Sequence, residues 1–413
     1  MEHATNPPSQ DATSLARDNS RKMIHLFINA LAASAGGGLT YVRNVLPCLA
    51  ARDDVRATVL LSAALRDEIA ESPGVTLLRE DCPASSGGRF WYEQRNLPEL
   101  IRRSRADLLL STGNFALCFS PVPQILLSRN ALYTSADFLR DLRTRGDYRL
   151  WLDTEVKATF ARWSVRTADC TVAPSAAFAR DLRQWTGKDV VSIHHGFDHD
   201  AFFREAAPLS PEVQAQIAAT SASLRLLFVS HYNYYRNFET LIRALAILKE
   251  ELRPRTVRLI LTCKLKSKDN PGDYHADTAA ELVRQLRLED DVVQLGAVPY
   301  GSLHHLYQAC DLYATPAYAE TFAHPLVEAM ASGLPVIASN LAVHREICGE
   351  AALYFPRFSP DMLAHQAMHA VQPEQRTSMR EMGRLRSQDF SWDKHVEELL
   401  RFARRLLETD SGR

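Results

Sequence analysis

The chain lacks any apolar run of about 18 residues, the length that a membrane-spanning helix needs. Its charges nearly cancel, with 48 lysines and arginines against 49 aspartates and glutamates, so composition gives no support for a nucleic-acid partner. Residues 1–21 are polar and contain no apolar signal core, so we expect a disordered leader and no secretory peptide. These absences favour a soluble globular protein, and 413 residues allow two or three domains.

The seven cysteines are scattered, and none of them stands at the spacing of a metal site. Their odd number argues against a disulfide framework. Most of them fall in apolar runs, where a thiol packs as a small hydrophobic group. We therefore expect the reducing cytosol as the compartment and no bound metal.

Apolar runs with the length of buried strands alternate with helical patterns along most of the chain. This alternation predicts an α/β protein whose parallel sheets are covered by helices on both faces. The strand-like runs lie at 23–29, 57–61, 75–78, 107–111, 124–128 and 170–174, and then at 224–230, 258–262, 292–295, 312–314 and 336–338.

A shift in composition at 198–223, where prolines and serines stand among alanines, marks the connection between two halves. We place the first domain at 22–205 and the second at 206–390. The segment 391–413 follows, and its amphipathic pattern predicts a helix over 393–407.

The segment 132–168 is rich in arginine and aromatic residues and has the pattern of one long helix. Three interpretations of it stay open. It is a solvated helical excursion, a wall of a ligand site or a face that lies against a membrane surface.

Two carboxylates, Glu320 and Glu328, are separated by seven residues around an expected helix start. Glu320 falls in the loop after a strand-like run, and Pro325 suits the first helical position, where a missing N–H costs nothing. Residues 326–332 then form a short helix that carries Glu328. Gly333 suits the left-handed cap that ends it.

This arrangement predicts an anion site. The free backbone N–H groups of the segment 321–325 and the positive end of the helix can hold a phosphate. Glu320 would then reach hydroxyls on the group that the phosphate carries, and Glu328 would reach a second sugar ring, as acidic residues reach a ribose in other nucleotide folds. Two isolated glutamates would be solvated side chains, but the helix start and stop signals around these two favour a ligand site.

The segment resembles the Glu-x7-Glu signature of glycosyltransferase family 4, also called glycosyl transferases group 1. Its surroundings at 303–311, 339–346 and 349–352 resemble the family too. The resemblance is strong from about residue 223 to 360 and weaker from 22 to 200. It implies the GT-B fold, in which two Rossmann-like domains face each other across a cleft. It also implies that the final helix crosses back to the first domain.

The resemblance implies a retaining, metal-independent hexosyltransferase without a cofactor, which moves a sugar from a nucleotide-diphosphate donor to a glycan or lipid-linked acceptor. Bacterial members of the family often build surface polysaccharides on lipid carriers. We therefore favour a mannosyltransferase with GDP-mannose as its donor, and a UDP-sugar is the second choice of donor. We expect a cytoplasmic protein, with peripheral contact to the inner face of the membrane left open.

Other functions remain open at this point. One alternative is another GT-B enzyme, such as a phosphorylase or a nucleotide-sugar epimerase. The other is a non-catalytic protein that binds a nucleotide sugar or a glycan, since a fold does not establish an activity.

The resemblance also assigns roles in the second domain. Arg236 stands where the family has a lysine and can bind phosphate bidentately, whereas Ser230 or His231 replaces a second cation that many relatives carry. The catalytic residues implied are Glu320, Arg236 and Glu328. The implied donor contacts are Gly37, Gly38, Ser230, His231, Arg236, Leu295, Glu320, Thr321, Phe322, Ala323, His324, Pro325 and Glu328.

In the first domain, the glycines at 36–38 resemble the family's loop near the diphosphate and the acceptor. Arg129 aligns with a histidine of the family, and Asn130 aligns with an aspartate. A guanidinium cannot serve as a base near neutral pH, so we expect Arg129 to contact the acceptor or the donor. The implied acceptor contacts are Gly36, Arg129 and Asn130. The adjacent His194 and His195 point to opposite sides of an extended chain, which argues against a metal pair.

Overall fold

The computed structural model describes residues 23–33, 37–65, 69–83, 85–204, 207–272 and 274–410. The expected leader at 1–21, Gly36 and the boundary between residues 205 and 206 lie outside the described residues.

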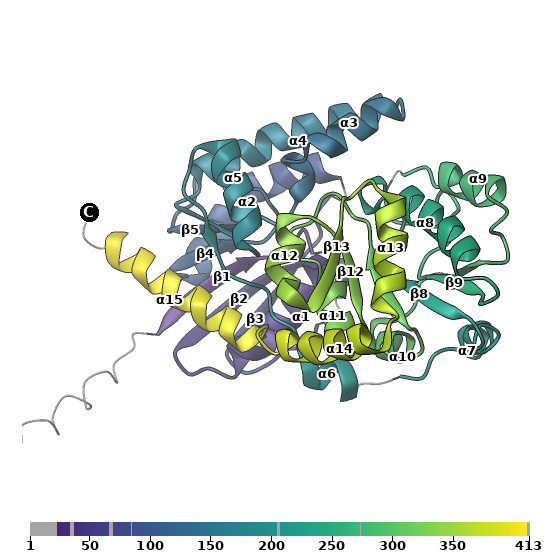
Figure 1. Cartoon of the computed structure of the whole chain (residues 1–413). Coiled ribbons are helices and arrows are strands. Elements are labelled where there is room, and N and C mark those ends of the chain that lie inside the picture. Colours follow the sequence, from purple (N-terminus) through teal and green to yellow (C-terminus); the bar gives the residue numbers. More distant parts are fainter. Residues whose placement is uncertain are drawn as a thin grey trace, which may run out of the picture.

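The first domain is built on a seven-stranded parallel sheet in the order β3-β2-β1-β4-β5-β6-β7 (Figure 1). Its strand order reverses between β1 and β4, where Leu26 pairs with Leu108. Nearly every residue of β1, β4 and β5 is buried, as continuous apolar runs require in a sheet covered on both faces. The strands are β1 (Ile24–Asn29), β2 (Val55–Ser62), β3 (Val75–Glu80), β4 (Leu108–Ser111), β5 (Gln124–Leu127), β6 (Cys170–Ala173) and β7 (Val191–Ser192).

The second domain is built on a six-stranded parallel sheet in the order β10-β9-β8-β11-β12-β13. Its order reverses between β8 and β11, so each sheet has a switch point at the carboxyl ends of its strands, where open α/β sheets bind ligands. The strands are β8 (Leu224–Phe228), β9 (Val257–Leu261), β10 (Val292–Gln294), β11 (Leu312–Thr315), β12 (Val336–Ser339) and β13 (Ala352–Phe355). The expected Rossmann-like pair of domains is confirmed, and the sequence did not predict the short strands β7 and β13.

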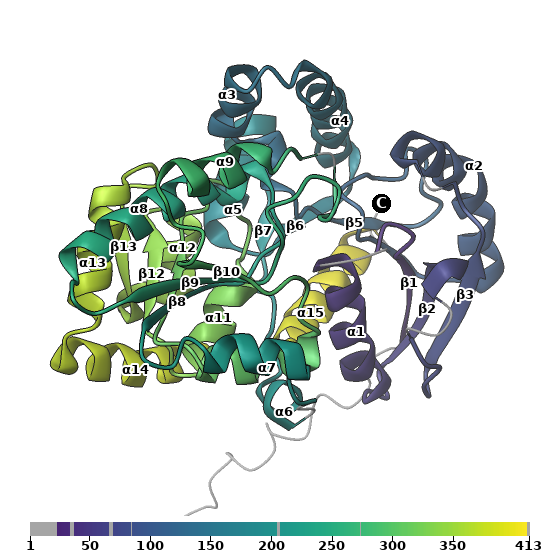
Figure 2. The same ribbon diagram turned by 90° about the vertical axis from the view of Figure 1, so that its right-hand side faces the viewer.

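Helices cover both faces of each sheet (Figures 1 and 2). In the first domain they are α1 (Gly37–Ala50), α2 (Ser86–Ser104), α3 (Ala136–Thr144), α4 (Tyr148–Thr167) and α5 (Ala176–Thr186). Along the chain, α6 (His199–Arg204) and α7 (Pro211–Ala218) come between the two sheets. In the second domain they are α8 (Phe238–Glu251), α9 (Asp277–Gln285), α10 (Leu303–Gln308), α11 (His324–Ala331), α12 (Ala342–Cys348), α13 (Pro360–Ala370) and α14 (Pro373–Ser387).

The single long helix expected at 132–168 is wrong, because the segment forms two helices, α3 and α4. Gly146 separates them with a φ of +72°, a left-handed conformation that glycine adopts without strain. Asp147 then caps α4, since its side chain accepts a hydrogen bond from the Leu150 N–H. In both views the two helices lie along the top of the molecule.

The last helix, α15 (Trp392–Asp410), follows the second domain in the chain but packs on the first. Its buried side chains Val396, Leu399 and Leu400 belong to the same hydrophobic cluster as the residues of α1 and β1. The Tyr41 hydroxyl of α1 also lies 3.0 Å from His395 Nε2. Figure 2 shows α15 beside α1. Within the described residues, no helix is both long enough and apolar enough to cross a bilayer.

Candidate functional site

The loop between β11 and α11 leads into a helix as the sequence predicts, but α11 spans His324–Ala331 and not 326–332. Ala323 takes a left-handed φ of +67°, α11 begins at His324, and Pro325 occupies the first turn. Gly333 ends the helix with a φ of +68°. A Cβ atom on Gly333 would lie 2.7 Å from the guanidinium end of Arg384, which can move aside, so it is the left-handed backbone that favours glycine there.

Glu320 and Arg236 form an ion pair across this loop. Arg236 ends the short 3-10 turn η3 (Tyr234–Arg236), and its Nη1 atom donates to Glu320 Oε2. The Thr321 N–H donates to Glu320 Oε1 at 3.1 Å, so this N–H is already engaged. Burial alone would raise the pKa of Glu320, but the charge of Arg236 and the other polar neighbours outweigh it and lower the pKa. Glu320 is therefore a carboxylate at neutral pH.

Glu328 lies on α11 and is 5% exposed. Its Oε2 atom accepts a hydrogen bond of 2.8 Å from the hydroxyl of Tyr307 on α10. Burial raises the pKa of Glu328 to about 7, against the lowering effect of Tyr307. The two carboxylates therefore differ, because Glu320 has a cation beside it and Glu328 has only a neutral donor.

The start of α11 is enclosed by aromatic side chains. Phe322 is buried, so only its backbone is available to a ligand. The His324 ring stacks on Trp392, with centroids 6.0 Å apart and planes at 18°. Burial lowers the pKa of His324 to about 4, so its ring is neutral near pH 7.

Ser230, His231 and Leu295 follow β8 and β10 at the carboxyl edge of the second sheet. The Ser230 hydroxyl donates to the His231 carbonyl at 2.7 Å. The Leu295 N–H donates to the Leu261 carbonyl at 2.9 Å, so this N–H is not free to contact the base of a nucleotide. Burial and the nearby Arg236 lower the pKa of His231, so this side chain does not replace the second cation at neutral pH.

In the first domain, Arg129 holds the glycine loop. Its Nη1 and Nη2 atoms donate to the carbonyls of Gly37 and Thr112 at 2.9 and 2.8 Å, and its guanidinium lies over the Tyr41 ring. Burial lowers the pKa of Arg129 to about 10, so it stays charged at neutral pH. Its buried Nε atom has no hydrogen-bond partner. A Cβ atom on Gly38 would lie 3.1 Å from Ala33 Cα, whereas one on Gly37 would meet nothing within 4 Å.

Asn130 serves local structure. Its Oδ1 atom accepts a hydrogen bond of 3.0 Å from the Leu132 N–H and so caps the 3-10 turn η2 (Ala131–Tyr133). The expected acceptor contact of Asn130 stays a prediction.

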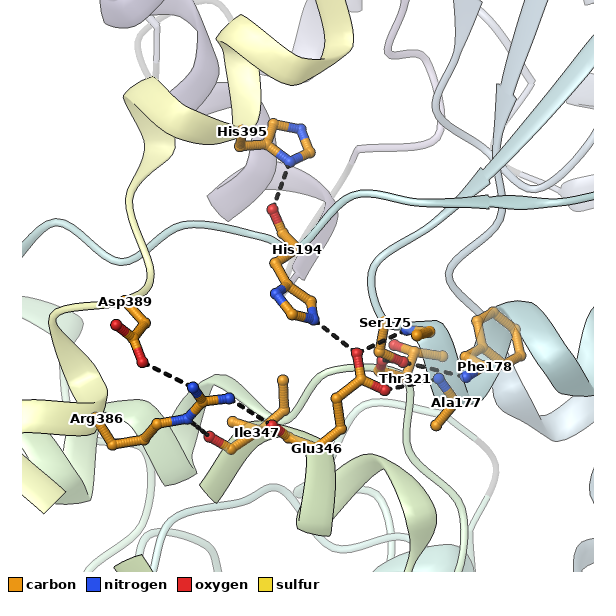
Figure 3. A network of polar contacts seen from close by, with 11 residues as sticks. Ser175, Ala177, Phe178, His194, Thr321, Glu346, Ile347, Arg386, Asp389 and His395 are labelled. Atoms are coloured by element: carbon orange, nitrogen blue, oxygen red, sulfur yellow. Dashed lines mark hydrogen bonds and ion pairs between the residues drawn. The ribbon is translucent and has the colours of Figure 1, made fainter. Parts of the chain in front are cut away.

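A polar network joins the two domains beside this site (Figure 3). Glu346 on α12 accepts hydrogen bonds from the N–H groups of Ala176 and Ala177, both at 2.7 Å, at the N-terminus of α5. His194 Nε2 lies 2.6 Å from Glu346 Oε1. Burial alone would raise the pKa of Glu346, but His194 and the two N–H groups outweigh it and lower the pKa.

The same network reaches the loop that carries Glu320 and the last helix. The Ser175 hydroxyl donates to the Thr321 carbonyl at 2.8 Å, directly after Glu320. His395 Nδ1 on α15 donates to the His194 carbonyl at 2.8 Å. Sequence reasoning missed the roles of Tyr307, Ser175 and Glu346. Tyr307 and Glu346 lie in the stretches 303–311 and 339–346 that resemble the family, so the resemblance was the signal that could have found them.

The structure thus brings Arg236, Glu320 and Thr321 into contact at the start of α11, with Glu328 on the same helix. Arg129 and Gly38 lie on the first domain, and Arg129 is close enough to contribute to the lowered pKa of His324. Among the described residues, no group of three histidine, cysteine or acidic side chains is placed to hold a metal ion.

Two family models match the chain. The model "Glycosyl transferases group 1" matches residues 211–386, and "Glycosyltransferase Family 4" matches residues 35–201. Together they cover most of the chain, one model for each domain.

Curated relatives match in part. The chain is 30% identical over 258 residues to a D-inositol 3-phosphate glycosyltransferase of Kineococcus radiotolerans, which is 59% of each chain. It is 30% identical over 171 residues to the O-antigen chain mannosyltransferase B of Escherichia coli, which is 40% of this chain and 42% of the relative. The alignments thus span less than two thirds of these relatives.

Solved structures share the fold over nearly the whole chain. A sucrose-phosphate synthase from Thermosynechococcus elongatus has a TM-score of 0.73 at 19% identity, and the match covers 94% of this chain and all of that one. Anabaena HepE, solved in complex with UDP and glucose, has a TM-score of 0.67 at 19% identity, and the match covers 92% of this chain and all of that one.

Proposed function

Because this chain belongs to the GT-B glycosyltransferases that the group 1 and family 4 models describe, we propose that it transfers a hexose from a nucleotide-diphosphate sugar to a glycan or glycolipid acceptor. The observation that carries the proposal is the buried pair Arg236–Glu320 beside the start of α11, with Glu328 on the same helix. A cation, a helix N-terminus and two carboxylates of different pKa suit a ligand with a diphosphate and two sugar rings.

In this proposal the diphosphate lies between Arg236 and the start of α11. The positive charge and the aligned N–H groups stabilise the negative charge that grows on the leaving phosphate. Glu320 orients hydroxyls of the donor sugar, and Glu328 accepts hydrogen bonds from the ribose.

The configuration at the anomeric carbon is retained, since the acceptor attacks on the face from which the phosphate leaves. The departing phosphate oxygen takes the acceptor proton. Transfer needs no metal, because Arg236 and the helix start supply the positive charge.

We propose GDP-mannose as the first donor to test and a UDP-sugar as the second. Similarity to an O-antigen mannosyltransferase supports the former, and the fold shared with a protein that was solved with UDP supports the latter. Synthesis of a surface polysaccharide in the cytoplasm is the matching role.

Peripheral contact with a membrane is part of the proposal, and α4 supports it. The face of α4 turned to the domain carries small side chains such as Ala158, Ala161 and Ser164. Its outer face carries large apolar side chains at helical spacing, which are 40–65% exposed. This outer stripe consists of Tyr148, Leu152, Val156, Phe160 and Trp163.

The test is a thermal-shift panel of GDP, UDP, ADP, TDP and CMP, with magnesium and with EDTA. A ligand of the native state raises the melting temperature with its occupancy. A shift with one diphosphate that EDTA leaves unchanged supports the proposal, and transfer of labelled sugar to an acceptor then completes it. Absence of a shift with every nucleotide contradicts it. Binding without turnover would favour a binding protein.

A further inference from the structure

Helix α3 belongs to the first domain but packs on the two second-domain segments that carry Arg236 and Glu320. The Phe138 ring of α3 lies edge-on to Tyr235, with centroids 6.2 Å apart. Asp137 forms an ion pair with Arg357 of the second domain. The α3 helix therefore contacts the donor side of the molecule through both apolar and charged side chains.

The centre of this contact is Arg145, at the end of α3. Its Nε atom donates to Asp141 Oδ1 and its Nη1 atom to Glu239 Oε1, both at 2.9 Å. Its guanidinium lies over the Tyr234 ring at 4.4 Å, within the turn that ends at Arg236. The side chains of Arg145 and Glu239 are 20% and 10% exposed, so this is a largely desolvated ionic group.

Asp141 carries the contact on to the Glu320 loop. Its Oδ2 atom accepts a hydrogen bond of 2.7 Å from the Tyr318 hydroxyl, two residues before Glu320. The Tyr318 N–H donates to the Tyr235 carbonyl at 2.9 Å. The turn that carries Arg236 and the loop that carries Glu320 are thus hydrogen-bonded to each other. Both also contact α3 of the opposite domain, the turn through ring contacts and the loop through a hydrogen bond.

We propose that Asp141 and Arg145 are positioning residues for the donor site, which hold Arg236 and Glu320 at the separation that a diphosphate sugar needs. The two residues that contact the donor lie on loops of one domain, and a helix of the other domain joins those loops. Donor binding and the approach of the two domains are therefore coupled. This inference rests on the proposed function for its substrate and on the contacts of α3 for its mechanism.

A purely structural role for this contact predicts a different result. If Asp141 and Arg145 only stabilised the fold, their loss would lower the melting temperature and the amount of active protein, and the KM values would not change. A positioning role predicts a selective rise in the KM for the donor, because the loops then sample arrangements that do not bind it.

The variant that distinguishes a positioning role from a purely structural role is Tyr318→Phe. It removes the hydrogen bond to Asp141 and leaves the Asp141–Arg145–Glu239 group intact. We expect the KM for the nucleotide sugar to rise about tenfold and the KM for the acceptor to stay the same, while the lost hydrogen bond lowers the unfolding free energy by about 1 kcal/mol. Arg145→Lys keeps the charge but loses the forked geometry, so we expect it to raise the donor KM in the same direction.

Tyr354→Phe is the matched control, since it also removes a hydroxyl that donates within the second domain, to the Gly349 carbonyl, and Tyr354 lies on β13. Hydrogen exchange of the peptides 232–237 and 316–322 gives a readout that needs no activity. We expect faster exchange there in Tyr318→Phe and unchanged exchange in the control.

An unchanged donor KM in Tyr318→Phe overturns the inference, whatever the exchange shows. A wild-type protein that neither binds nucleotides nor transfers sugar overturns the proposed function instead. In that case hydrogen exchange alone tests whether α3 orders the peptides 232–237 and 316–322. Equal exchange in Tyr318→Phe and wild type would then show that it does not.

Discussion

Arg236 donates a hydrogen bond to Glu320, and the two side chains are 21% and 11% exposed. A largely buried cation is therefore neutralised by the carboxylate that we expect to bind the donor sugar. An incoming diphosphate must share Arg236 with Glu320, so the pair links the charge of the leaving group to the orientation of the sugar.

Glu320→Gln tests this link. Loss of the charged partner leaves Arg236 buried without compensation, so the free protein should lose about 3 kcal/mol of unfolding free energy. A nucleoside diphosphate restores a negative charge there, and it should therefore raise the melting temperature more in the variant than in wild type. Transfer should fall about a hundredfold. The exposed Glu350→Gln is the control, and an equal diphosphate shift in wild type and Glu320→Gln would contradict the prediction.

Glu328→Gln should separate stability from binding. Burial raises the pKa of Glu328 from 4.5 to about 7. Between these two pH values Glu328 is protonated in the folded protein and ionised in the unfolded chain. Stability is therefore lost as the pH rises from about 4.5 to 7, by up to about 3 kcal/mol. The glutamine has no such cost and can still accept from Tyr307.

We expect Glu328→Gln to be more stable than wild type at pH 8 and equally stable below pH 4.5, by denaturant unfolding at both pH values. Nucleotide binding should weaken, because a carboxylate is the stronger acceptor for ribose hydroxyls. If Glu328→Gln is less stable than wild type at pH 8, burial of the charged Glu328 carboxylate does not destabilise the folded protein.

Glu346→Gln should destabilise the junction of the domains by about 1–2 kcal/mol, since the carboxylate accepts two N–H groups at the start of α5. Because the pKa of Glu346 is lowered in the folded protein, its contribution to the unfolding free energy depends on pH. Its contribution is present above about pH 4.5 and is lost as the pH falls through the folded-state pKa.

The difference in unfolding free energy between wild type and Glu346→Gln should therefore shrink from pH 7 to pH 3. The substitution Glu350→Gln, just after α12 and exposed, is again the matched control. A pH-independent difference would assign the effect of Glu346 to side-chain packing alone.

Leu152→Glu and Val156→Glu should weaken binding to vesicles of phosphatidylglycerol and phosphatidylcholine, because they place charge within the exposed stripe of α4. Co-sedimentation measures the bound fraction. Leu385→Glu, at an exposed leucine on α14, should bind as wild type does. If wild type does not sediment with the vesicles, the stripe has no affinity for lipid.

The sequence predicted those parts of the fold that depend on local chemistry. Buried parallel strands are continuous apolar runs, so most strands of both sheets were identified. Pro325 and Gly333 likewise marked the start and end of α11. The break at Gly146 was missed because a single glycine is tolerated within a helical pattern.

Contacts between distant residues could not be predicted in this way. Tyr307 reaches Glu328 from another helix, and Glu346 reaches Ala176 across 170 positions. Nothing in the residues next to each partner indicates the pairing, because it depends on how the domains pack. Glu320 was identified from the helix signals around it and Arg236 from the family resemblance, and their direct ion pair came only from the structure.

The return of α15 to the first domain also affects how the chain is made. The first domain is synthesised first, but Trp392, Val396 and Leu400 complete its core. Until these residues leave the ribosome, Tyr41 of α1 lacks its ring contacts with Trp392 and His395, and the apolar surface that α15 covers is open to chaperones and to aggregation. A nascent chain cut short before Trp392 would therefore be a substrate for proteolysis, even though both of its sheets are complete.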